Sequence, residues 1–128
     1  MIAAEGLREQ VRWHRYVTED HLAELYAGAR AFAFLSEYEG LGLTPLEALA
    51  AGVPPVLLDT RVARESCGNA ALYVPAGDLH ATTEALREAM FSETARRAVL
   101  DAAPQALARY RWRDAARDTL TLLEASAS

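Results

Sequence analysis

The sequence predicts an α/β domain with a Rossmann-like parallel sheet and flanking helices. Short apolar runs without a helical period occupy residues 11–14, 31–35, 55–58 and 70–74, which is typical of buried parallel strands. Segments with helix start and stop signals lie between these runs. Because strands that alternate with helices form right-handed βαβ units, the order of the segments favours one doubly wound sheet.

The first two helices are expected where a capping residue precedes apolar residues at helical spacing. Thr18 can cap a helix that ends near Gly28, because its hydroxyl can accept a hydrogen bond from a free amide of the first turn. The segment Thr44-Pro45-Leu46-Glu47 opens a second, short helix, which Gly52 and Pro54 stop.

Three more helices are expected in the C-terminal half. Asp78 and Ser92 can cap the first two of them, and Pro104 predicts a kink or a break in the second. The last follows Trp112 and carries apolar residues on one face. Because no strand separates the final helices, we expect them to pack on the sheet, so that residues 1–128 form one domain.

Composition narrows the classes of protein to consider. Of the 128 residues 52% are hydrophobic, the net charge is −5, and all 13 cationic side chains are arginine. An acidic chain is a poor candidate for binding nucleic acid, because phosphate contacts need a basic face. Cys67 alone cannot form an intrachain disulfide, and no apolar run is long enough to span a membrane. We therefore expect a cytoplasmic protein.

A glycine-containing loop follows the strand predicted at 31–35. Gly40 and Gly42 allow the backbone to approach a ligand or to adopt a positive φ. The amides of Leu43 and Thr44 would then lie at a helix N-terminus, which favours an anion such as a phosphate. Ligands of open α/β sheets bind beyond the carboxyl ends of strands, so this loop is the candidate binding site.

Two carboxylates, Glu39 and Glu47, bracket the loop. Each could accept hydrogen bonds from hydroxyl groups, as on a ribose or a hexose. An alternative stays open for Glu47, because Thr44 and Glu47 fit the S/T-x-x-E pattern of a capping box. Glu39 could equally be a solvated loop residue.

The remaining polar residues give weaker indications. His14, His21 and His80 are far apart and show no ligand spacing with Cys67, so no metal site is predicted. Glu65 could share a rim with Glu39 or be an exposed acid near a turn. The chain has no lysine and no G-K-[ST] sequence, which excludes a P-loop.

The segment 39–47 resembles the E-x7-E motif of family 4 glycosyltransferases, in the C-terminal domain of the GT-B fold. In this sequence the motif reads Glu39, Gly40, Leu41, Gly42, Leu43, Thr44, Pro45, Leu46, Glu47. The similarity extends to GVPPVLLD, to RESCGNAALYVPAGD and to YRW near the end of the chain. Enzymes of this family transfer a sugar from a nucleotide-diphosphate donor with retention of configuration.

The resemblance implies a role for each position of the motif. Glu47 would hydrogen-bond the ribose of the donor, and Glu39 would contact the transferred sugar as the catalytic-site carboxylate. The backbone at Gly40, Leu41, Gly42, Leu43 and Thr44 would hold the sugar and the diphosphate. The resemblance implies no cofactor and no metal beyond the nucleotide-sugar donor itself.

The resemblance also implies partners that this chain lacks. In the family, an Arg and a Lys that clamp the diphosphate lie upstream, as does the acceptor-binding N-terminal domain. We therefore expect the donor-binding half of a glycosyltransferase, inactive alone. The alternatives are a non-catalytic nucleotide-sugar-binding module and a structural domain that forms a homodimer through an uncovered strand at 11–14, because an open sheet edge can pair with another chain.

Overall fold

The computed structural model describes residues 6–7 and 9–126. Its three strands form one parallel sheet in the order β1-β2-β3, which confirms the predicted α/β class. The helices and strands in chain order are α1 (Glu19–Gly28), β1 (Phe32–Phe34), α2 (Leu43–Ala50), β2 (Pro55–Leu58), α3 (Arg61–Cys67), β3 (Leu72–Val74), α4 (Leu79–Phe91), α5 (Glu93–Leu107) and α6 (Trp112–Ser126).

The central strand β2 anchors the core, and all four of its residues are buried. Leu57 packs in a cluster with residues of α2, α3 and α5. Val56 and Leu58 belong to a second cluster, with Ala89 of α4. Because successive side chains of a strand point to opposite faces, this division places helices on both sides of the sheet.

Local capping chemistry sets the starts of three helices, as the sequence predicts. The side chains of Thr18, Asp78 and Ser92 accept hydrogen bonds from amides three residues ahead, at 3.3, 2.9 and 3.2 Å. Ser92 also ends α4, so one residue joins α4 to α5. The predicted break at Pro104 is not seen. α5 continues through Pro104 and ends at Leu107.

The strand predicted at residues 11–14 is wrong. These residues are exposed coil, and the side chain of Trp13 is 75% exposed. A strand needs a neighbour for its amides and carbonyls, and within the described residues the sheet starts at β1. β1, not residues 11–14, is therefore the edge of this sheet.

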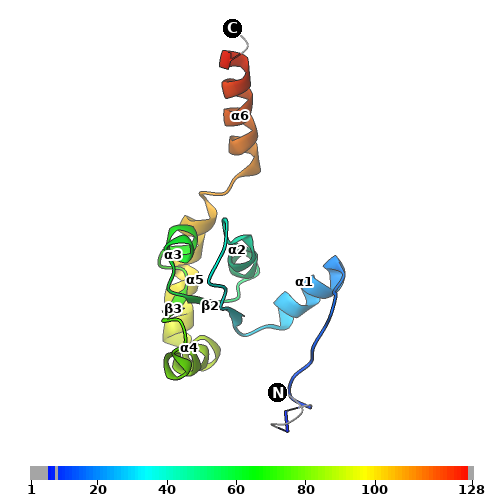
Figure 1. Cartoon of the computed structure of the whole chain (residues 1–128), viewed down its shortest axis with the longest axis vertical. Coiled ribbons are helices and arrows are strands. Elements are labelled where there is room, and N and C mark those ends of the chain that lie inside the picture. The colour runs from blue at the N-terminus through cyan, green and yellow to red at the C-terminus, as the bar shows by residue number, and fades with distance from the viewer. Residues whose placement is uncertain (1–5, 8, 127–128) are drawn as a thin grey trace.

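The prediction that the last helices pack on the sheet holds for α4 and α5 and is wrong for α6. α5 contributes Val99, Ala103 and Ala106 to the core, whereas α6 has no buried residue. Figure 1 shows α6 extending away from the sheet and from the helices that cover it. The reason is the size of the sheet, since α2, α3, α4 and α5 already cover both faces of three short strands.

Candidate functional site

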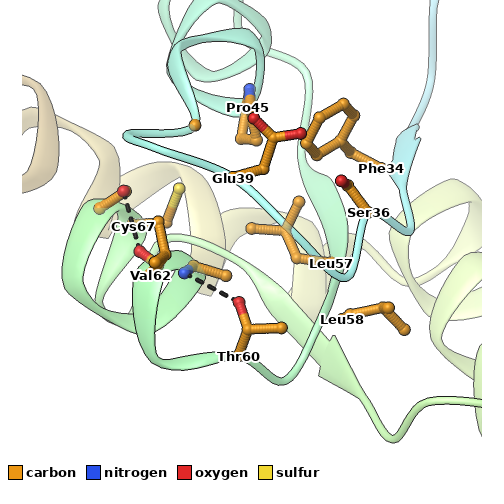
Figure 2. A pocket seen from close by; sticks show the side chains of 12 residues that line it. Phe34, Ser36, Glu39, Pro45, Leu57, Leu58, Thr60, Val62 and Cys67 are labelled. Atoms are coloured by element: carbon orange, nitrogen blue, oxygen red, sulfur yellow. Dashed lines mark hydrogen bonds between the residues drawn. The ribbon is translucent and has the colours of Figure 1, made fainter.

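A small, shallow cleft, with an internal volume of about 20 Å³, lies beyond the carboxyl ends of β1 and β2, between the start of α2 and α3. This is the position at which open α/β sheets bind ligands. Figure 2 shows Leu57 in the middle of the cleft, with Glu39, Phe34 and Ser36 to one side of it and Val62 and Cys67 to the other. The lining residues are Phe34, Ser36, Glu39, Gly42, Pro45, Leu57, Leu58, Thr60, Val62, Ala63, Ser66 and Cys67.

Glu39 reaches the cleft from the loop between β1 and α2. The Ser36 hydroxyl donates to the Tyr38 carbonyl at 3.1 Å, which holds the loop just before Glu39. Glu39 is itself exposed and lines the cleft. A carboxylate in this position is a hydrogen-bond acceptor, suited to hydroxyl groups of a ligand.

Gly42 turns the loop into α2. It is the N-cap of α2, in the left-handed conformation at φ 73° and ψ 53°, and no side chain caps the helix. The amides of Gly42, Leu43 and Thr44 precede the first hydrogen bond within the helix, and Pro45 has no N–H to satisfy. Gly40 has no positive φ, and open space surrounds the position of an added Cβ. Of the two glycines in this loop, the backbone conformation therefore requires glycine only at Gly42.

The capping-box alternative for Glu47 is wrong. A capping box places Ser or Thr at the N-cap and Glu at the third helical position. Here α2 starts at Leu43, which makes Thr44 the second residue of the helix and Glu47 the fifth. The left-handed turn at Gly42 starts the helix earlier than the pattern in the sequence indicates.

Glu47 instead contacts a side chain from α1. It is exposed on α2 and does not line the cleft. The Tyr26 hydroxyl donates to Oε2 of Glu47 at 3.5 Å, and the Tyr26 ring packs against Phe32, with ring centroids 5.9 Å apart. Burial raises the pKa of Tyr26, and the nearby negative charge of Glu47 raises it further.

Ser66 is a buried residue of the cleft that the sequence did not indicate. Its hydroxyl lies 2.5 Å from the carbonyl oxygen of Leu41 and 2.9 Å from that of Val62. Ser66 therefore fixes the glycine loop to α3. The sequence does contain start and stop signals for α3, namely Thr60 and Gly68. The Thr60 hydroxyl accepts a hydrogen bond from the amide of Ala63 at 3.2 Å, and Gly68 follows the last helical residue.

One arginine of α3, Arg64, is already paired. Arg64 donates to both carboxylate oxygens of Asp59, at 2.7 and 2.9 Å, and lies over the Tyr73 ring. The hydrogen bond from Arg64 lowers the pKa of Asp59, and burial raises the pKa of Tyr73 to about 12. Among the described residues that line the cleft, none carries a positive charge.

The other candidates from the sequence lie apart from this loop or are unreactive. Glu65 is exposed on α3 and does not line the cleft. His14 and His21 form an edge-to-face pair with centroids 5.0 Å apart. Burial raises the pKa of Cys67 to about 11, so this thiol stays protonated at neutral pH.

In the part of the chain that the structure describes, no three His, Cys, Asp or Glu side chains are placed to hold a metal ion. No described helix is both long enough and apolar enough to cross a bilayer.

Comparison with known proteins gives a family and several relatives. Residues 1–106 match the family described as Glycosyl transferases group 1. The chain is 40% identical over 81 residues to O-antigen chain mannosyltransferase B of Escherichia coli, a match that covers 62% of this chain and 21% of the relative. It is 32% identical over 121 residues to D-inositol 3-phosphate glycosyltransferase of Corynebacterium urealyticum, and this match covers 91% of this chain and 28% of the relative.

A third relative is GDP-mannose:cellobiosyl-diphosphopolyprenol alpha-mannosyltransferase of Xanthomonas oryzae pv. oryzae. The identity is 36% over 69 residues, which are 51% of this chain and 18% of the relative. In all three comparisons the chain spans less than a third of the length of the relative that it matches.

Proposed function

Because the chain belongs to the glycosyl transferases group 1 family, we propose that it is the donor-binding half of a retaining glycosyltransferase. Residues 1–128 would form a single partial nucleotide-sugar-binding domain. One observation carries the proposal: the start of α2, with no side chain capping it, lies at the cleft with Glu39 before it and Glu47 just after it. Free amides suit a diphosphate, and carboxylates suit the hydroxyls of the groups on either side of it.

Each part of the loop has a role in this proposal. The amides of the segment from Gly40 to Thr44 bind the diphosphate and stabilise the charge that develops on it as the sugar leaves. Glu47 accepts hydrogen bonds from the ribose, and Glu39 accepts them from hydroxyls of the transferred sugar. Neither carboxylate acts as a nucleophile, and the reaction uses no metal.

We propose GDP-mannose as the donor. Two of the relatives are named as mannosyltransferases, and one of these names includes GDP-mannose. In this proposal the amides and carboxylates contact the diphosphate, the ribose and the sugar of the donor. None of these contacts involves the base, so they do not distinguish GDP from UDP. UDP is therefore the proper comparison ligand for GDP.

We propose that transfer requires an acceptor-binding N-terminal domain besides these residues. The described residues that line the cleft carry no positive charge, and the chain has no lysine. A diphosphate leaving group needs cations near it, since amides alone neutralise only part of its charge. The 128 residues therefore bind the donor and do not transfer its sugar.

Calorimetric titration of the chain with GDP, and with UDP for comparison, tests the donor site. Glu47→Ala removes a charged acceptor and should weaken GDP binding about tenfold or more. Because Glu47 is exposed and caps no helix, the free energy of unfolding should change by less than about 0.5 kcal/mol. Glu88→Ala, an exposed acid on α4, serves as the matched control.

Three results would contradict the proposal. The first is no GDP binding by the unmodified chain, and the second is equal affinity in Glu47→Ala. The third is robust transfer from GDP-mannose to an acceptor by these residues alone, which would remove the need for an N-terminal domain.

A further inference from the structure

Tyr26 joins α1 to α2, because its hydroxyl donates to Glu47. α1 has no buried residue, and Tyr26 is one of its half-buried residues. The Tyr26 ring packs against Phe32 at the start of β1, and its hydroxyl reaches Glu47 on α2. One side chain thus contacts both the sheet and the carboxylate that brackets the loop.

Glu47 needs such a contact if it is to bind a ligand in one orientation. It is exposed, and a glutamate side chain rotates about three bonds, so binding must order it. The contact from Tyr26 reaches Oε2 at 3.5 Å. A carboxylate has acceptor capacity on both of its oxygens, so the second oxygen stays available for a ligand.

We propose that Tyr26 is a positioning residue, whose hydroxyl holds Oε2 of Glu47 and leaves Oε1 to accept a hydroxyl of the donor ribose. The inference rests on the proposed function, because it assigns Glu47 to the ribose. Tyr26 itself touches no ligand in this arrangement. It acts through the carboxylate, and its ring is held in place by Phe32.

The ionisation of Tyr26 agrees with a donor role. Burial and the charge of Glu47 both raise the pKa of its phenol, so the hydroxyl keeps its proton throughout the neutral range. The ring signals of Tyr26 in NMR spectra report this titration without any ligand. Glu47→Gln removes the negative charge and should lower the pKa of Tyr26, and an unchanged pKa would overturn the contact.

The second measurement is GDP affinity in a double-mutant cycle of Tyr26→Phe and Glu47→Ala. Tyr26→Phe keeps the ring and removes the hydroxyl, and we expect about a fivefold loss of affinity. In the Glu47→Ala background the same change should have almost no effect, because the carboxylate that it positions is gone. Tyr16→Phe, at an exposed tyrosine of the N-terminal segment, is the matched control and should bind GDP normally.

The outcomes separate this inference from the proposed function. If the unmodified chain binds GDP and Tyr26→Phe binds equally well, the positioning role is wrong and the donor site stands. Equal losses in both backgrounds would also overturn the positioning role, since Tyr26 would then act independently of Glu47. If the unmodified chain binds no GDP, the proposed function fails and this inference fails with it.

Discussion

Gly42 determines how the loop meets α2. Its left-handed backbone starts the helix at Leu43 and leaves the first amides without a side-chain cap. A Cβ added at Gly42 would lie 3.7 Å from the Ser66 hydroxyl oxygen, which is an ordinary contact. The need for glycine is therefore conformational and does not arise from lack of space.

Gly42→Ala should lower the free energy of unfolding by about 1–2 kcal/mol, because alanine in the left-handed region is strained. Chemical denaturation measures this cost. Gly40→Ala is the matched control in the same loop, since Gly40 has no positive φ and open space around it. Its effect should stay within about 0.5 kcal/mol. Equal costs at the two glycines would contradict the assigned roles.

Single residues differ in how far the sequence could predict them. Glu39 and Gly42 follow from their position after a strand, and the structure places both at the cleft. The pattern of Thr44 and Glu47 could not decide between a cap and a free carboxylate, because the answer depends on the backbone of Gly42. Ser66 contacts Leu41 across 25 positions, and no local pattern encodes such a contact.

Elements whose ends depend on local chemistry were predictable. Thr18, Asp78 and Ser92 cap the helices that follow them, because capping uses amides only three residues away. The strand expected at 11–14 and the packing of α6 both needed a neighbouring element. An apolar pattern indicates that a segment can be buried, but it does not indicate what would cover the segment.

Removal of residues 112–128, a segment that contains α6, should leave the rest of the fold almost unchanged. α6 has no buried residue, so we expect the thermal midpoint to move by less than about 4 °C. Removal of residues 92–128 is the control, and it should prevent folding because α5 supplies Val99, Ala103 and Ala106 to the core. A large loss of stability on removing α6 alone would show that it packs on the domain.

Over the whole molecule, the length of the relatives and the charge of the cleft support the proposal that transfer needs residues beyond these 128. The family match covers residues 1–106, and the relatives are more than three times as long as the stretch they share with this chain. The cleft offers amides and a carboxylate, and its described lining residues carry no positive charge. The sequence predicted the α/β class from alternating segments, whereas the lack of positive charge among the described lining residues is evident only from the structure.

The most direct test of the donor site is amide NMR during titration of the chain with GDP. The account predicts that the amide signals of Gly40, Leu41, Gly42, Leu43 and Thr44 shift first and most strongly. The signals of α6 should not move, because that helix extends away from the sheet and the helices that cover it (Figure 1). Saturable shifts confined to another surface, such as the groove between α3 and α5, with the 40–44 amides unmoved, would contradict the account.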